Sequence, residues 1–516
     1  MSLRGISSHA WWFAGILAVL VGMQFFLSPL ALLAIAVSAL FLFLTVRRPL
    51  GTLTFLAVYL PFEPFLLKFV PDELYVFARF FSEGLVYVLA AIVVWRLLTG
   101  RVKFKPTAFD LPFLLFILVL VTGAVVNAVS PEIAVLGARQ ILRFVILYYV
   151  ALHIDAPRAY VVKLTRILLV AMALQAAIGL GQAAIGPAAD EFLLPEETRT
   201  AGEVTFGGVS QFWEAGTRIF ATLGRYDKLG NFLAFFLPFS LAFLYQRSKQ
   251  AASRRSWWWV LGLGGVALAL TYSRASWIAL LIAVVYIGIV IKRDRRLLFA
   301  LTALTALSAL YLAVSGLNVR YITEAPGQTL VERFYESFSA ARWRGEYYGI
   351  GRVYWMVQTP LTVVPASPFF GWGPGQFGGG AVSALGNTTV YDKLGLPFGV
   401  FGSEGVIDNN WFSLWGETGT LGLAFFVWML GACLSQARHV WRTHVSPAVR
   451  SIALGFGGAL LGVCAIAMLS TVFEIRTTAF YLWTYAGFIA AFAQERRSSQ
   501  QARDPSSAAP PLDDGR

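Results

Sequence analysis

Residues 257–291, WWWVLGLGGVALALTYSRASWIALLIAVVYIGIVI, decide the fold class of this chain. They contain two apolar runs, 257–272 and 275–291, on either side of a polar turn that includes Arg274. A membrane-spanning helix needs roughly 20 mainly apolar residues. We therefore interpret the stretch as two short membrane spans joined by a tight turn.

The rest of the sequence repeats this pattern. Of its 516 residues, 57% are hydrophobic and only 13% are charged, whereas soluble domains carry about 25% charged residues. No cleavable signal peptide is evident, and both cysteines fall inside predicted spans, which argues against a disulfide framework or a metal cluster. The sequence predicts an all-α, polytopic integral membrane protein with about 14 transmembrane helices. These are expected at 10–27, 29–46, 50–64, 77–96, 110–128, 134–152, 163–184, 229–246, 257–272, 275–291, 298–316, 410–435, 451–470 and 477–493.

Lysine and arginine cluster in alternate short loops. Under the positive-inside rule, these loops and both termini face the cytoplasm. The net charge of +13 is then explained by topology and gives no indication of nucleic-acid binding. We expect a membrane domain over 1–493 and a disordered cytoplasmic tail over 494–516. The basic clusters lie at 47–48, 101–105, 158–166, 247–255, 292–296 and 438–450.

This topology places residues 317–409 outside, as a long periplasmic loop in a Gram-negative cell. The loop is polar, rich in glycine and arginine, and we expect it to form half of an active site. The segment 185–228 and the turn at Arg274 are the other notable outer segments. An ionisable group at the depth of Arg274 suggests function. The alternative is an interfacial arginine that extends to the lipid headgroups.

The outer arginines indicate an anionic ligand. Guanidinium groups bind phosphate and pyrophosphate bidentately and without a metal. The alternative is structural pairing with Glu196, Glu197, Glu332, Glu336 or Glu346. The candidate substrate-binding arginines are Arg218, Arg225, Arg274, Arg342, Arg344 and Arg352. Trp343, Tyr347, Tyr348 and Trp372 are candidates for stacking on sugar rings, or else membrane-interface aromatics.

A general base on the outer side has to be a carboxylate. The histidines, His9, His153, His439 and His444, are all predicted to be cytoplasmic. Asp408 is the best-placed carboxylate because it precedes a helix, where the helix dipole favours negative charge. The alternative is that Asp408 or Asn409 only caps that helix. Other carboxylate candidates are Glu404, Asp227 and Glu346.

Four segments, in order along the chain, resemble motifs of one membrane-protein family. They are GTRIFATLGRYDKLGNFLAFFLP (216–238), LALTYSRASWIAL (268–280), GRVYW (351–355) with FFGWGPGQF (369–377), and DNNWFSLWGETGTLGL (408–423). Each is similar to a motif of the O-antigen ligase/polymerase superfamily, whose core would cover about 200–430.

The resemblance implies a polytopic α-helical enzyme that uses no metal or other cofactor. Such enzymes transfer a glycan from an undecaprenyl-pyrophosphate carrier to an acceptor hydroxyl in the periplasm. Arg218 and Arg352 match the arginines that engage the donor pyrophosphate, and Arg274 matches the Ser-Arg arginine. The resemblance further implies that Gly371, Gly373 and Gly375 shape the loop near the carrier, and that Asn409 and Glu417 belong to the helix that follows.

One departure from the family pattern concerns the reaction. Ligases, which transfer the glycan to lipid A-core, have a histidine general base where this chain has Asp408. The resemblance therefore favours an inverting polymerase of exopolysaccharide or O-antigen repeats, in the inner membrane. The alternatives are an O-antigen ligase and a lipid-linked sugar transporter or flippase. Expected partners are the undecaprenyl-pyrophosphate-linked glycan and membrane lipid, with a flippase and chain-length or export proteins in the same pathway, and no nucleic acid.

Overall fold

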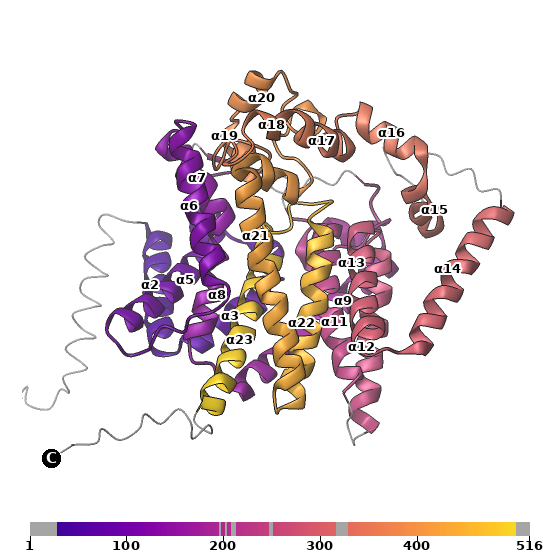
Figure 1. Cartoon of the computed structure of the whole chain (residues 1–516), viewed down its shortest axis with the longest axis horizontal. Helices are drawn as coiled ribbons and strands as arrows, with labels where there is room; N and C mark the ends of the chain where they lie inside the picture. The colour runs from indigo at the N-terminus through magenta and orange to yellow at the C-terminus, as the bar shows by residue number, and fades with distance from the viewer. Residues whose placement is uncertain are drawn as a thin grey trace, which may run out of the picture.

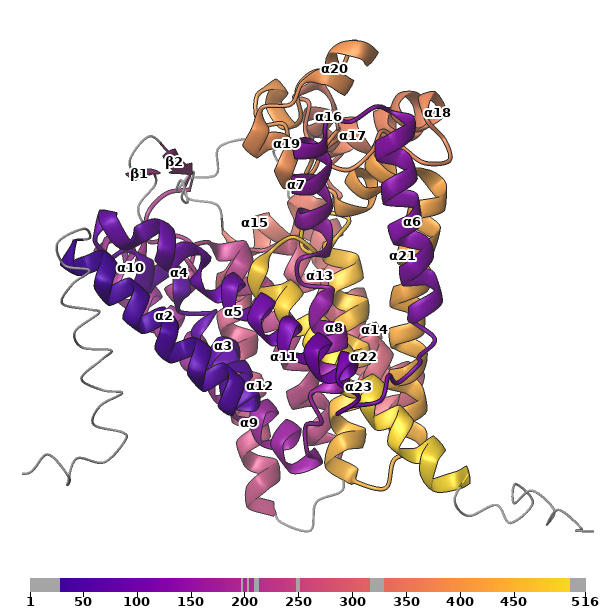
Figure 2. The same ribbon diagram turned by 90° about the vertical axis from the view of Figure 1, so that its left-hand side faces the viewer.

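The computed structural model describes residues 28–195, 198–201, 204–207, 213–246, 251–315 and 329–501. The chain forms an upright bundle of helices with a smaller helical layer above one end (Figures 1 and 2). One short hairpin is present, with β1 (Thr198–Ala201) antiparallel to β2 (Val204–Gly207). The helices outside the upper layer are α2 (Pro29–Arg47), α3 (Pro49–Tyr59), α4 (Glu63–Leu67), α5 (Asp72–Leu98), α6 (Asp110–Val126), α7 (Pro131–Leu142), α8 (Ile146–His153), α9 (Arg158–Ile185), α10 (Pro187–Leu193), η1 (Ala221–Leu223), α11 (Tyr226–Leu244), α12 (Ala251–Leu270), α13 (Arg274–Val284), η2 (Val285–Ile291), α14 (Arg295–Ser315), α21 (Asn410–Thr443), α22 (Pro447–Ile466) and α23 (Arg476–Gln501).

The helices confirm a multi-pass membrane protein but not fourteen spans. Among the described residues, seven helices are long and apolar enough to cross a membrane, or eight if α7 and α8, bent by 48°, count as one span. The expected span at 50–64 is wrong in length, because α3 has only 11 residues before a turn. The span expected at 10–27 lies outside the described residues. The seven helices are α2, α5, α9, α11, α13 with η2, α21 and α22.

Segments predicted to be cytoplasmic meet at one end of the bundle. Lys105 Nζ lies 2.9 Å from Asp155 Oδ1, and Arg158 Nε lies 2.7 Å from Glu495 Oε2. Helix α23 continues to Gln501, beyond the point at which a disordered tail was expected. The turn that contains Arg274 lies at the other end, beneath the upper layer.

Helix α11 forms the centre of the bundle. All of its residues from 229 to 244 are buried, and α22 packs against it. Gly455 of α22 allows this close approach, since a Cβ there would lie 2.6 Å from Phe239 Cα. Small residues let membrane helices pack in this way. The first turn of α11 is thereby held in the middle of the upper end.

The upper layer is a folded cap with its own hydrophobic core. Trp355, Phe377, Tyr391 and Ile407 are fully or almost fully buried and belong to one cluster. The cap lies above the upper end of α21 and beside the upper ends of α6 and α7 (Figure 2). The polar loop expected over 317–409 is thus largely helical from residue 330 onward. Its elements are α15 (Leu330–Tyr335), η3 (Glu336–Phe338), α16 (Ala340–Tyr348), α17 (Arg352–Gln358), η4 (Thr359–Val363), α18 (Val364–Ala366), α19 (Gly380–Leu385), α20 (Thr389–Leu394) and η5 (Val400–Gly402).

Candidate active site

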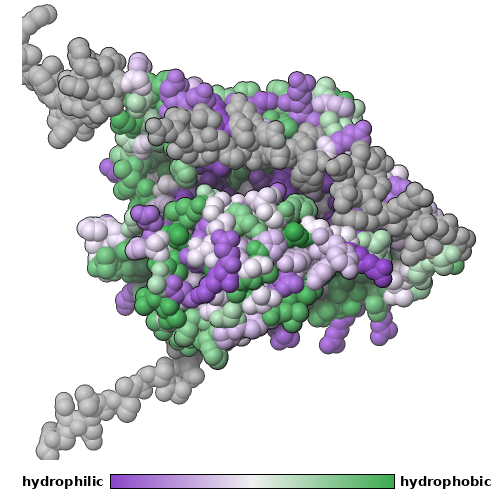
Figure 3. Space-filling model, turned by 90° about the horizontal axis from the view of Figure 1, so that it is seen from above, coloured by the Kyte–Doolittle hydropathy of each residue, from purple (hydrophilic) through white to green (hydrophobic). Residues whose placement is uncertain are grey.

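A cavity rich in arginine lies where the cap meets the bundle. It contains about 870 Å³ of empty space, part of which is open to solvent, between the first turn of α11, the start of α13, helices α15 to α17 and residues 469–470. Seen from above, hydrophilic surface lies in a hollow near the middle of the molecule (Figure 3). We call this space the first cavity. Its charged lining residues are Arg225, Asp227, Arg274, Arg333, Arg342, Glu346, Arg352 and Asp408.

Arg352 and Asp408 form an ion pair in this cavity. Arg352 begins α17, Asp408 directly precedes the cap residue of α21, and Nη2 donates to Oδ2 at 2.8 Å. Burial by itself lowers the pKa of Arg352, but the Asp408 and Glu346 carboxylates outweigh it, and the pKa is raised. Nε of Arg352 is buried without a hydrogen-bond partner in the described chain. The pair therefore presents both a carboxylate and a spare cationic donor.

Asn409, not Asp408, caps α21. The Asn409 side chain accepts a hydrogen bond from Phe412 N at 3.1 Å, as an N-cap residue does. Asn409 is fully buried, and its Nδ2 has no hydrogen-bond partner within the described ranges. Since the capping is done by its neighbour, the Asp408 side chain is available to Arg352.

Glu336 holds three arginines beneath the cap. Its buried carboxylate lies 3.1 Å from Arg274 Nη1 and 3.2 Å from Arg333 Nη1, and it also pairs with Arg342, which contacts Glu346 as well. The structural alternative thus applies to Arg274 and Arg342. The Glu336 and Glu346 carboxylates among three guanidinium groups nevertheless leave positive charge uncompensated. Burial and then the nearby Arg218 lower the pKa of Arg333 to about 10, and a bound anion would offset that repulsion.

Arg218 lies behind the cavity wall. It is buried, its guanidinium lies 4.6 Å from the centre of the Tyr226 ring, and its Nη1 has no hydrogen-bond partner among the residues described. Tyr226 lines the cavity, whereas Arg218 does not. Arg225 does line it, 2.9 Å from Asp227, whose carboxylate raises the pKa of Arg225. Arg344 is exposed on α16 and lies outside the cavity lining.

The three loop glycines fasten the cap to the bundle and do not line the cavity. Gly371, Gly373 and Gly375 have φ of +66°, +96° and +75°, a region that favours glycine. Gly373 N donates to Glu417 O, and Gly375 N donates to Glu417 Oε1, each at 2.9 Å. The loop fits a break in α21 at Gly419, where φ is +66°. The three glycines thus pack the cap against α21, and their role near the carrier stays a prediction.

Sequence reasoning assigned no role in the site to several other lining residues. Tyr272 has a φ of +55°, a strained backbone at the tip of the turn before α13. Asn231 Oδ1 accepts from Ser276 Oγ at 3.0 Å and so joins α11 to α13. Arg333 reaches the site only because α15 folds back under the cap. The sequence indicated the contact between Asn231 and Ser276 only by placing one polar residue in each of two apolar helices.

Comparison with protein families identifies part of this region. Residues 259–427 match the family described as O-Antigen ligase. The match runs from α12 through the cap to the middle of α21 and so includes Arg274, Arg352 and Asp408, whereas Arg218 and Arg225 precede it. No curated protein matches the chain.

Proposed function

We propose, from the match of residues 259–427 to the family described as O-Antigen ligase, that the chain polymerises undecaprenyl-pyrophosphate-linked oligosaccharide repeats. The reaction would take place at the periplasmic face of the bacterial inner membrane. The observation that carries this proposal is the Arg352–Asp408 pair in an arginine-rich cavity at the end of a membrane bundle. An anion-binding group and a carboxylate base are the two parts that glycosyl transfer from a pyrophosphate requires.

The arginines would stabilise the leaving group. In the reaction, the acceptor hydroxyl oxygen forms a bond to the donor's anomeric carbon, and the bond from that carbon to the pyrophosphate oxygen breaks. The pyrophosphate leaves with the electron pair, so negative charge builds on it. Arg352 and Arg225 line the cavity in which it would lie. Fixed cations at a developing anion lower the barrier because they need no reorganisation.

Asp408 would take the proton of the acceptor hydroxyl. Its Oδ2 is bound to Arg352, while its Oδ1 has no hydrogen-bond partner in the part of the chain described. A carboxylate within hydrogen-bonding reach of the attacking hydroxyl acts as a general base. Arg352 would then contact both the leaving group and the base, and attack in line with the departing oxygen inverts the anomeric carbon.

The position of the histidines supports a polymerase rather than a ligase. His153 ends α8, and His439 and His444 lie at the C-terminal end of the 34-residue helix α21, whose N-terminal end meets the cap. Among the described residues, no histidine lines the first cavity. A ligase that depends on a histidine base would lack it here, whereas Asp408 occupies the corresponding place.

The cellular glycan provides the test. Arg352→Ala should abolish long-chain polymer in a cell whose surface glycan depends on this protein, leaving single repeats on the acceptor. Lys393→Ala, which removes an exposed cation from α20 of the same cap, should leave the ladder intact. Normal polymer in the Arg352 variant would refute the proposal. Finished polymer that accumulates on its lipid carrier would instead identify a ligase.

A further inference from the structure

A second basic cavity lies beside the first at the same end of the bundle. The first turn of α11 separates them, because Arg225 and Asp227 line the first cavity and Lys228 lines the second. The connection from α22 to α23 also separates the two cavities. Its residues 469–470 line the first cavity and its residues 474–477 line the second. The two cavities are therefore neighbours that share a wall.

Cations dominate the second cavity. Two carboxylates, Glu63 and Glu474, face six basic side chains, an excess of positive charge larger than that of the first cavity. It contains about 1170 Å³ of empty space, part of it open to solvent. An anion would be attracted to such a site. Its basic lining residues are Lys68, Arg79, Arg143, Arg199, Lys228 and Arg476.

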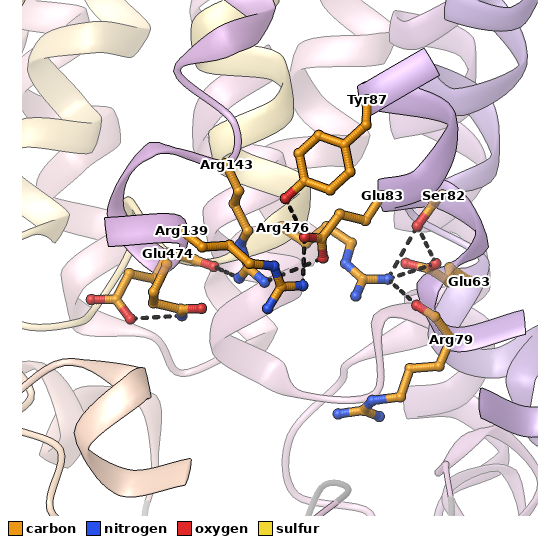
Figure 4. Close-up of polar contacts among 10 residues, drawn as sticks. Glu63, Arg79, Ser82, Glu83, Tyr87, Arg139, Arg143, Glu474 and Arg476 are labelled. Carbon is orange, nitrogen blue, oxygen red and sulfur yellow. Dashed lines mark hydrogen bonds and ion pairs between the residues drawn. The ribbon is translucent and has the colours of Figure 1, made fainter. Parts of the chain in front are cut away.

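Buried partners hold several of these cations in place. Arg476 Nη1 donates to Glu63 Oε1 at 2.8 Å and to Ser82 Oγ at 3.1 Å (Figure 4). Arg143 Nη2 donates to the Glu474 carbonyl at 2.8 Å. Guanidinium groups fixed in this way lose little conformational entropy when a ligand binds. The cavity is thus built before any ligand arrives.

Two cationic groups in this wall have unused donors. The Lys228 side chain is not exposed, and its Nζ has no hydrogen bond or ion pair in the described part of the chain. Nε of Arg143 is buried without a hydrogen-bond partner in the same ranges. A buried donor without an acceptor costs free energy. A phosphate oxygen between these side chains would supply the missing acceptor.

An apolar groove begins where the second cavity ends. Arg143 lines both, and the groove continues between α5, α6 and α8 along Val93, Phe113, Ile146 and Val150. It offers about 1140 Å³ of partly open space along helices that include the membrane span α5. A charged site joined to a hydrocarbon-lined groove matches a ligand with an anionic head and a long apolar tail.

We infer that the second cavity binds the phosphate or pyrophosphate head of a second polyprenyl lipid, with its tail in the adjoining groove. This inference rests on the proposed function, in which the acceptor as well as the donor is lipid-linked. The shared wall would hold the two heads side by side, so that the acceptor glycan reaches over the first turn of α11 toward Asp408.

Native mass spectrometry of the full-length protein in nanodiscs can count bound lipids, with undecaprenyl pyrophosphate as the probe. We expect two lipids on the wild type, one on Lys228→Met, one on Arg352→Gln and none on the double variant. Lys228→Arg should restore two, and Lys393→Met should retain two. The loss of one charged contact to phosphate predicts about a tenfold or greater rise in the dissociation constant.

Thermal unfolding of each variant shows whether it is folded. If Lys228→Met does not fold, Lys68→Gln replaces it, because within the described residues Lys68 bonds only to the carbonyls of Glu191 and Phe192. Two lipids on a folded Lys228→Met or Lys68→Gln variant would overturn the inference. Displacement of the second lipid by phosphatidylglycerol would also overturn it, since the cavity would then hold ordinary phospholipid. If the wild type binds one lipid and Arg352→Gln binds none, the second site is rejected and the proposed function stands. If Arg352→Gln binds two lipids, the donor site is rejected.

Discussion

Replacement of Arg352 by glutamine should weaken donor binding far more than it weakens the fold. The Arg352 and Asp408 side chains are 31% and 36% exposed. An ion pair with this degree of solvent exposure contributes about 0.5 kcal/mol to stability. A charged hydrogen bond to a phosphate oxygen contributes about 1.5–3 kcal/mol. Because 1.4 kcal/mol changes a dissociation constant tenfold, the donor's affinity should fall roughly 10- to 100-fold.

The two quantities can be measured on the same preparation. Titration of the protein in nanodiscs with the lipid-linked repeat gives the dissociation constant, and thermal unfolding gives the stability. Lys393→Gln removes an exposed cation of the same cap, 4.8 Å from the centre of the Trp372 ring, and should leave donor affinity unchanged. If Arg352→Gln lowers the unfolding temperature markedly but leaves donor affinity unchanged, the ion pair is structural and the pyrophosphate site is misplaced.

Three further changes test separate parts of the site. Asp408→Asn keeps the shape but removes the base, so the initial rate of transfer should fall about 10²- to 10⁴-fold with donor affinity retained; a near-normal rate rules Asp408 out as base. Glu336→Gln leaves three arginines around a neutral, fully buried group and should destabilise the protein by about 3 kcal/mol. The change is measured as a lower unfolding temperature. Glu404→Gln, at an exposed position, should leave the unfolding temperature unchanged. Gly371→Ala would place a Cβ 2.4 Å from the backbone of α21 and should destabilise more than Gly386→Ala, where φ is also positive but no atom lies within 4 Å; equal unfolding temperatures would contradict the packing role of the loop.

Local patterns were enough to locate much of the fold and part of the site. Apolar runs predicted α9, α21 and α22 closely, because a membrane helix must satisfy its backbone internally and be apolar over its length. Two motifs, each at the start of a helix, predicted Arg352 and Asp408 as site residues, although they did not predict that the two side chains pair. These features depend on a few neighbouring residues, and so the sequence carries them directly.

Other features depend on contacts between distant segments. The glycines of 369–377 fit the kink at Gly419, and no local pattern indicates that kink. Arg218 is displaced from the cavity by the Tyr226 ring, while Arg333 reaches it through the folding of α15. The bend between α7 and α8 turns one predicted span into two short helices. In each case tertiary packing determines the position of the side chain.

The central claim is most directly tested by reconstitution. Purified protein in lipid vesicles, supplied with the lipid-linked repeat isolated from the producing cell and without ATP or an ion gradient, should yield a ladder of longer glycans. One undecaprenyl pyrophosphate should be released for each new bond, as counted by mass spectrometry. Single repeats that only move across the bilayer would contradict the account in favour of a transporter, and transfer only when lipid A-core is added would contradict it in favour of a ligase.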